Sequence, residues 1–233
     1  MNERTTDFRK LAVRSFGAAI AALAVVAPAQ AIEAFTAHYQ ASALGMQGEG
    51  QMVLARQAGN RWQYSLSIRN SLVDLSQQTV FDVQGDWLRP LSSSDVSRML
   101  VKRKSVNTSY DWDKRQARWS GDVKPGRAGP AAIREGDMDA LLLNLAIVQD
   151  VAAGKTPSYR LVENGEVKML NYKLAGKEKI TVAGKTYNAT KAIRDTGKRQ
   201  MIVWIVPEMP VPARILQREN GRDAIDLQIK SWR

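Results

Sequence analysis

The stretch RWQYSLSIR, residues 61–69, decides the fold class. Its apolar side chains, Trp62, Tyr64, Leu66 and Ile68, alternate with polar ones. Successive side chains of a β-strand point to opposite faces of the sheet, so this alternation predicts a strand with one buried face and one wet face. One-sided strands of this kind are typical of antiparallel sheets.

The same alternation recurs in SVNTSYDWD (105–113) and AIDLQIKSW (224–232). Gly-Asn or Asn-Gly pairs at 59–60, 164–165 and 220–221 mark tight hairpin turns, because these residues tolerate the positive φ angles that such turns need. Hairpin after hairpin predicts an antiparallel sheet of about ten strands. Neither a shift in composition nor an internal repeat marks a second domain, so residues 32–233 are expected to form a single β-rich domain.

The segment VWIVPEMPVPARILQ, residues 203–217, joins two apolar runs through three prolines. Proline lacks a backbone donor and is confined to turns and strand edges. The run QMIVWIV (200–206) is therefore expected to be a strand buried on both faces, with Pro207–Pro210 as the turn and the following residues as the returning strand.

One segment, DMDALLLNLAIVQDVAAGK (137–155), departs from the alternation and predicts a helix over residues 139–153. Asp137 or Asp139 is expected to cap its start, and Gly154 to follow its last turn. We expect this helix to be a lid on the concave face of a curved sheet or incomplete barrel, since its apolar residues recur at helical spacing: Leu141, Leu142, Leu145, Val148 and Val151.

The first 31 residues have the layout of a secretory signal peptide. Four basic residues precede a short apolar run that ends in the small-residue triplet Ala29-Gln30-Ala31. The alternative is a membrane anchor, but the apolar run is shorter than the roughly 20 residues that span a bilayer. We predict cleavage after Ala31, which leaves no transmembrane anchor. The sequence contains no cysteine, so a disulfide and a lipidated N-terminal cysteine are both excluded, and a soluble periplasmic protein is expected.

The formal net charge is +11, and removal of the +2 carried by residues 1–31 leaves +9 on the mature chain. A basic surface attracts lipopolysaccharide, anionic phospholipid or acidic polymers. The alternative is that the scattered lysines and arginines serve solubility alone. The densest basic run is VKRKS, residues 101–105. Nucleic acid is not expected as a partner of an exported protein.

The residue types that carry most enzyme chemistry are scarce. The single histidine, His38, lies in a predicted strand, and no serine stands in a G-x-S-x-G elbow. Zinc-ligand clusters are missing, and AAGKT (152–156) and VAGKT (182–186) lack the first glycine of a phosphate loop. We therefore expect no enzyme activity, cofactor or metal. A glycosidase-like pair of carboxylates stays open, because sequence does not pair acidic residues across a sheet.

Several large apolar residues are candidates for the lining of a ligand pocket under the helix. The alternative for each is that it simply fills the core. The candidates are Trp62, Tyr64, Trp112, Leu142, Leu145 and Trp204.

The order of these motifs along the chain is similar to that of a known protein family. The chain opens with FTAHYQASALGMQGEGQMVL, continues through WLRPLSSSDV and the acidic helix start, and closes with VWIVPEMPVPARILQRENGRDAIDLQIKSW. Over residues 35–232 it resembles the bacterial envelope family known as domain of unknown function 3108. The closing hairpin is more loosely similar to that of periplasmic lipoprotein carriers and related lipid-binding half-barrels. These likenesses concern the fold, and no catalytic residues come with them.

Two hypotheses of function follow. The first is a non-enzymatic periplasmic protein that binds a lipid or acyl chain in a half-barrel under the helix. The second is an interaction module with a filled core that docks on envelope proteins or peptidoglycan.

Overall fold

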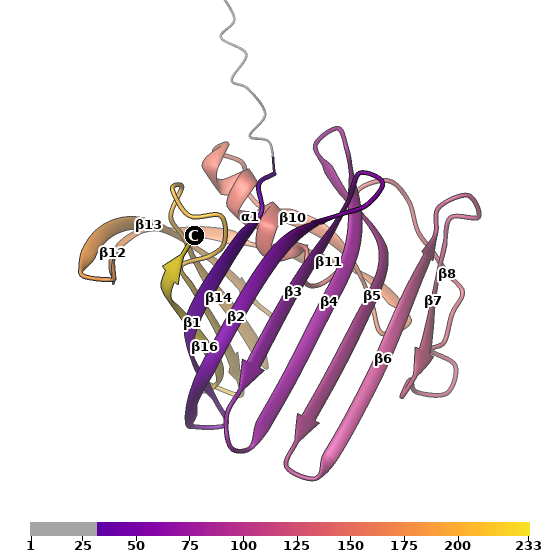
Figure 1. Ribbon diagram of the computed structural model, residues 1–233, viewed down its shortest axis with the longest axis horizontal. Helices are drawn as coiled ribbons and strands as arrows, with labels where there is room; N and C mark the ends of the chain where they lie inside the picture. Colours follow the sequence, from indigo (N-terminus) through magenta and orange to yellow (C-terminus); the bar gives the residue numbers. More distant parts are fainter. Residues whose placement is uncertain (1–31) are drawn as a thin grey trace, which may run out of the picture. The chain divides into compact units, whose positions relative to one another are not determined.

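The computed structural model describes residues 32–233, which form one compact unit (Figure 1). The predicted signal peptide, residues 1–31, lies outside the described residues. Within residues 32–233, the α-helix is too short to cross a bilayer.

The described chain is built from strands, with a single α-helix among them. The helix is α1 (Leu143–Ala152). The strands are β1 (Phe35–Ala43), β2 (Met46–Gln57), β3 (Arg61–Arg69), β4 (Val73–Gln84), β5 (Trp87–Met99), β6 (Lys102–Asp111), β7 (Gln116–Gly121), β8 (Ala131–Ala132), β9 (Asp137–Met138), β10 (Ser158–Glu163), β11 (Glu166–Asn171), β12 (Lys173–Val182), β13 (Lys185–Asp195), β14 (Arg199–Ile205), β15 (Arg214–Glu219) and β16 (Arg222–Trp232).

Most strands belong to one curved antiparallel sheet of 13 strands, in the order β12-β13-β14-β15-β16-β1-β2-β3-β4-β5-β6-β7-β8. The sheet is open, because β12 and β8 stand at opposite ends of this order. The first and last strands of residues 32–233, β1 and β16, pair with each other inside the sheet. A second sheet has the order β11-β10-β9, with β9 parallel to β10.

The mainly antiparallel β fold is confirmed, whereas the expected count of about ten strands is wrong. The prediction relied on the alternation of apolar and polar residues, and several strands do not show this alternation. Strand β12 is exposed along almost its whole length, and β8 and β9 have only two residues each. A strand without a buried face leaves no period-2 signal to detect.

The helix is shorter than predicted, with residues 143–152 in place of 139–153. Its N-cap position is Leu142, and no side chain caps it. The predicted capping role of Asp137 or Asp139 is therefore wrong. Asp137 belongs to strand β9, and Asp139 accepts a hydrogen bond from the backbone N–H of Leu141, which lies before the helix. Gly154 follows the last turn with a positive φ angle, as predicted.

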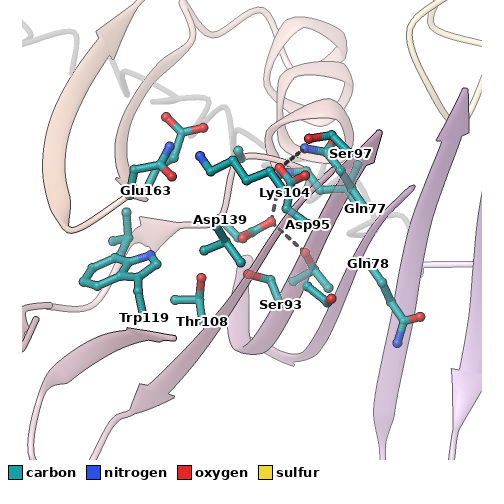
Figure 2. Close-up of a pocket in the computed structure, with 17 residues that line it drawn as sticks. Gln77, Gln78, Ser93, Asp95, Ser97, Lys104, Thr108, Trp119, Asp139 and Glu163 are labelled. Atoms are coloured by element: carbon teal, nitrogen blue, oxygen red, sulfur yellow. Dashed lines mark hydrogen bonds between the residues drawn. The ribbon is translucent and has the colours of Figure 1, made fainter. Parts of the chain in front are cut away.

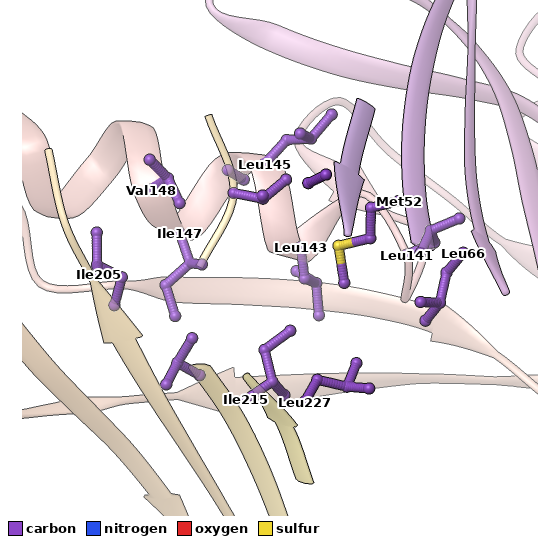
Figure 3. Close-up of a cluster of buried hydrophobic side chains, with 14 of the residues drawn as sticks. Met52, Leu66, Leu141, Leu143, Leu145, Ile147, Val148, Ile205, Ile215 and Leu227 are labelled. Atoms are coloured by element: carbon purple, nitrogen blue, oxygen red, sulfur yellow. The ribbon is translucent and has the colours of Figure 1, made fainter. Parts of the chain in front are cut away.

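We call the face of the 13-stranded sheet that α1 packs against the inner face. Figure 3 shows Leu143, Leu145 and Ile147 of α1 in one buried cluster with Met52 and Leu66 of the N-terminal strands and Ile215 of β15. Strand β3 buries the predicted face, since its four apolar side chains are at most 8% exposed. This contact gives the molecule its main hydrophobic core.

The proline segment makes a turn, as the sequence predicts, but the returning strand β15 begins at Arg214 and not directly after Pro210. The longer turn is itself part of the core. Met209 and Val211 are buried, and the Tyr39 hydroxyl donates to the backbone oxygen of Pro212 at 2.8 Å. The prolines end β14 and precede β15, where a missing N–H donor interrupts no ladder.

Candidate functional site

The inner face of the sheet changes from apolar to polar along its cross-strand rows. In one row the directly paired residues run from Leu66 of β3 to Gln77 of β4, Asp95 of β5 and Val106 of β6. The next row runs from Tyr64 to Thr79, Ser93 and Thr108. Directly paired residues of a sheet lie on the same face. In these rows the inner face of β4 and β5, together with Thr108 of β6, therefore presents hydroxyl, amide and carboxyl groups, where β3 presents Leu66 and the buried Tyr64.

A hollow of about 120 Å³ lies over this polar part of the inner face (Figure 2). Residues 139–141, before α1, and residues 162–164, at the turn between β10 and β11, line its opposite wall. Lys104 of β6 also lines it, and Figure 2 shows this side chain reaching across the hollow near Asp95. We call this space the inner-face hollow.

Asp139 is the buried polar anchor of the hollow. The Thr79 hydroxyl donates to its Oδ1 at 2.6 Å, and the Tyr110 hydroxyl donates to its Oδ2 at 3.3 Å. The Leu141 N–H donates to Oδ1 at 2.9 Å. Burial raises the pKa of the Asp139 carboxyl, and the hydrogen bonds from Thr79 and from Leu141 partly offset that rise. Asp139 thus ties the segment before α1 to strands β4 and β6.

Asp137 provides a second attachment for the segment before α1. Its carboxylate is fully buried and forms a two-point ion pair with the Arg160 guanidinium of β10. It also accepts from the backbone N–H of Arg134 at 3.0 Å, and the Trp87 indole donates to its backbone oxygen at 3.2 Å. Hydrogen bonds to a carboxylate from a fork-shaped guanidinium fix its geometry. One wall of the hollow is therefore held in place.

The rim of the hollow offers a mixture of donors and acceptors. Asp95 accepts from the Gln77 amide at 2.8 Å, and Glu163 accepts from the Lys168 ammonium group at 2.6 Å. The Lys104 ammonium group is a donor, and the hydroxyls of residues 93 and 97 both donate and accept. Such a lining can pair with hydroxyl and amide groups of a ligand, whereas an apolar chain would leave these groups unpaired.

Three acidic residues line the hollow, namely Asp95, Asp139 and Glu163. Each already accepts hydrogen bonds from the protein, and Asp139 is almost wholly buried. Its two oxygens face side chains of the sheet, so it is poorly placed to protonate a ligand. Among residues 32–233, no group of three or more histidine or acidic side chains is close enough to hold a metal ion.

Four of the predicted pocket residues lie in the main core. Trp62, Tyr64, Leu142 and Leu145 are at most 6% exposed. The Tyr64 hydroxyl contacts the Met52 sulfur at 3.0 Å, and the Arg56 guanidinium covers the Trp62 ring at 4.8 Å from its centroid. These residues contact other side chains of the core.

Trp204 belongs to the same buried cluster but faces away from the helix, and Trp112 packs against a second, smaller cluster. Trp204 is buried, but it alternates with Val203 and Ile205 and so points away from α1. Its ring meets Arg214, and its indole donates to Glu178 at 3.0 Å. Trp112 packs edge to face on Trp87 at 4.8 Å between ring centroids, and its indole donates to the backbone oxygen of Pro90 at 2.7 Å. The structure does not bring the six residues around one space, and none of them lines the inner-face hollow.

Sequence reasoning missed the residues of the hollow. The serines at 92–94 lie in the middle of β5, between the paired neighbours β4 and β6. Polar residues in a strand are ordinarily assigned to the wet face. The available signal was that β4 and β5 are polar at successive positions over residues 76–79 and 92–95, which indicates strands with polar side chains on both faces.

A second hollow of about 660 Å³ lies over β1–β3 and β16, and His38 lines it together with Glu49, Arg69 and Lys230. These side chains alternate with the buried ones, so this hollow is on the outer face. It is a broad polar depression, and His38 lies on the first strand, as the sequence predicts.

The comparisons with known proteins identify the family. A family model described as "Protein of unknown function (DUF3108)" matches residues 34–227, which confirms the resemblance found in the sequence. A search of curated proteins gave no significant match.

Two solved structures show a distant likeness. "Crystal structure of MucB" is 10% identical with a TM-score of 0.35, and the alignment covers 86% of this chain and 52% of that one. "The complex structure of Pseudomonas aeruginosa MucA/MucB" is 12% identical with a TM-score of 0.36, covering 86% and 51%. The chain thus spans about half the length of these structures.

Proposed function

We propose that the chain, which belongs to the DUF3108 family, is an exported, non-enzymatic binding module of the bacterial cell envelope that holds a polar ligand in its inner-face hollow. The observation that carries the proposal is the switch in chemistry along the inner face. Where α1 packs, the face is closed by apolar side chains, and where the β10–β11 turn lies over it, a polar hollow stays open. Binding sites are concave and contain a few convergent polar groups.

The lining favours a ligand rich in hydroxyl and amide groups. Gln77, Ser93 and Thr108 present neutral polar groups, and Lys104 lies across from Asp95. A ligand with a uniform strong charge would meet a like charge in this mixture. Glycan and peptide groups such as those of peptidoglycan have the required chemistry, so peptidoglycan fragments are the first probes to use.

An apolar ligand under α1 remains the competing prediction from the sequence. The burial of Leu142 and Leu145 against the strands favours a filled core over an apolar cavity there. Native mass spectrometry of gently purified protein separates the two proposals. Co-purified lipid or acyl chains, retained when the lining of the hollow is altered, would overturn the polar-ligand proposal.

The direct test is calorimetric titration of the mature chain with a soluble peptidoglycan disaccharide-peptide. We expect binding that is lost on Gln77→Ala and Asp95→Asn. Gln57→Ala is the matched control, because it removes an exposed glutamine at the end of β2 that is far along the sheet from the hollow. If all three variants bind like the parent, the hollow is not the binding site.

The non-enzymatic and exported parts of the proposal have their own readouts. The recovered disaccharide-peptide is expected to be unchanged by mass after incubation, and its hydrolysis would overturn the non-enzymatic part. The protein recovered from the periplasm of an expressing bacterium is expected to begin at Ile32. A mature protein that still carries residues 1–31 would contradict cleavage after Ala31.

A further inference from the structure

Three neighbouring hairpin turns lie at one end of the sheet, and the outer two of them carry large exposed apolar side chains. They are the turn between β1 and β2, the turn between β3 and β4, and the turn between β5 and β6, all at the lower edge of Figure 1. Val101 is 96% exposed and Leu100 is 64% exposed. Leu44, Met46 and Met99 are each between 43% and 47% exposed. We call this set the turn row.

The turns of the row are joined to one another by hydrogen bonds. The Asn70 amide donates to the backbone oxygens of Ala43 and Met46, both at 3.1 Å. The Leu100 N–H donates to the backbone oxygen of Leu72 at 2.8 Å. The three turns are thus joined in one row, and the exposed apolar side chains of the outer two can meet one surface together.

Folding by itself does not favour leucine at these turns. Leu44 and Leu100 have φ angles of 54° and 56°, in the left-handed region that suits glycine and asparagine. At three other turns of the described chain the residue with this conformation is an asparagine, namely Asn60, Asn164 and Asn220, and at two more it is Arg115 and Ala183, neither of which is a large apolar residue. Leucine at these positions both strains the backbone and exposes apolar surface. Two unfavourable choices in turns at the same end of the sheet point to a role outside folding.

The apolar tips are flanked by positive charge. Arg98, Lys102 and Arg103 stand on either side of Leu100 and Val101, and no acidic residue lies between positions 98 and 104. The nearest carboxylate of β4, Asp74, pairs with both Arg69 and Arg98 and neutralises one of them. The turn row is therefore apolar at its tip and basic just behind it.

We propose that the turn row docks on the surface of an anionic phospholipid bilayer. Leucine, methionine and valine side chains at the tips would enter the headgroup region, and the lysines and arginines behind them would lie at the level of the phosphates. This is the arrangement of a protein that lies on a membrane without crossing it. A docked turn row would hold the chain at the bilayer surface whether or not the inner-face hollow is occupied.

The first test is cosedimentation of the chain from Ile32 onward, which comprises the compact unit, with vesicles. Equal parts of phosphatidylglycerol and phosphatidylcholine are compared with phosphatidylcholine alone. We expect binding to the anionic vesicles and little to the neutral ones. Lys102→Gln with Arg103→Gln is expected to weaken binding roughly tenfold or more, since each basic residue near an anionic surface contributes about fivefold. Lys177→Gln with Lys179→Gln, on exposed β12, is the charge-matched control and is expected to have a much smaller effect.

The second test separates docking from folding. Leu44→Asn with Leu100→Asn places the residue that each turn prefers, so the thermal midpoint is expected to stay the same or to rise. Vesicle binding is nevertheless expected to fall. Ala183→Asn is the matched control, because Ala183 occupies the same kind of turn position with a φ angle of 49°. It is expected to keep vesicle binding unchanged.

Three results would overturn the proposal. One is equal binding of the parent to anionic and neutral vesicles, or binding to neither. Another is a double asparagine variant that folds and binds like the parent. The third is a parent that is dimeric by sedimentation and becomes monomeric in the double asparagine variant, because the row would then be an interface between two copies of the chain.

Discussion

The two halves of the inner face belong to the same curved antiparallel sheet but have opposite chemistry. From β14 through β3 the inward side chains are hydrocarbon, and α1 closes over them. From β4 through β6 the inward side chains include Gln77, Ser93, Asp95 and Thr108, and the space above them stays partly open. We refer to these parts as the apolar half and the polar half.

This contrast shows how one curved sheet can form both a hydrophobic core and a candidate binding site. Hydrocarbon faces close because burial removes apolar area from water, at roughly 25 cal/mol per Å². Polar faces resist closure, because each group taken out of water needs a partner. The polar half meets this need at its base, where Asp139 collects donors from Thr79, Tyr110 and Leu141. The groups at its rim can still meet a ligand.

The largest expected effect comes from placing a charge in the apolar half. Leu145 is 5% exposed, and Leu145→Asp would bury an unpaired carboxylate. Truncation of a buried leucine alone typically costs about 2–5 kcal/mol, out of a typical total of about 5–15 kcal/mol. We expect a sharp fall in the thermal midpoint and exposure of surface that binds an apolar dye. The control is Ser67→Thr on the outer face, which should do neither. A Leu145→Asp protein that melts like the parent would show that α1 is not part of the core.

The next largest effect is expected at the base of the polar half. Asp139→Ala removes the acceptor for two hydroxyls and one backbone N–H. Leaving buried donors unsatisfied costs about 1–3 kcal/mol, measured as the free energy of unfolding in urea. Asp139→Asn keeps a carbonyl oxygen for Thr79 and Leu141 and should be milder. Equal losses in the two variants would argue that charge, and not hydrogen bonding, holds the segment before α1.

A smaller effect is expected in the pH dependence of stability. Burial raises the pKa of Asp139 in the folded protein above its unfolded value of about 3.9, so the folded state holds the proton more tightly. The resulting stabilisation is complete below the unfolded pKa and is lost as the pH rises through the raised folded pKa. We expect the free energy of unfolding of the parent, minus that of Asp139→Asn, to fall as the pH rises from about 4 to 8. A difference that is flat or that rises with pH would contradict the raised pKa.

The smallest expected effect on stability is at the rim of the polar half. Asp95 is exposed and pairs with Gln77, so Asp95→Asn should change the free energy of unfolding by less than about 0.5 kcal/mol. Ligand binding is expected to be lost in the same variant. A rim residue such as Asp95 should therefore affect ligand binding and not stability, whereas Asp139 at the base should affect stability. A variant that loses several kcal/mol would place Asp95 among the structural residues with Asp139.

The sequence by itself determined the fold class. The strict alternation in residues 61–69, the Asn-Gly pairs and the proline turn after β14 are local signals, and the structure uses each of them as predicted. The apolar helix was also evident, because Leu145 and Val148 recur with the helical period and are buried on it. Such signals can be recognised in the sequence because they involve residues that are close together along the chain.

Only the tertiary structure decided where the candidate site lies. Gln77, Asp95, Lys104 and Asp139 are far apart in the sequence, and the registers of β4, β5 and β6 together with the segment before α1 bring them together. In the sequence, their polar side chains look like those of any solvent-exposed strand face. Only the position of the β10–β11 turn shows that this face is covered and therefore belongs to the inner face. The same holds for Trp204, whose direction follows from the face of β14 that α1 covers. Which side of a strand is covered is a long-range property, set by packing between elements that are distant in the chain.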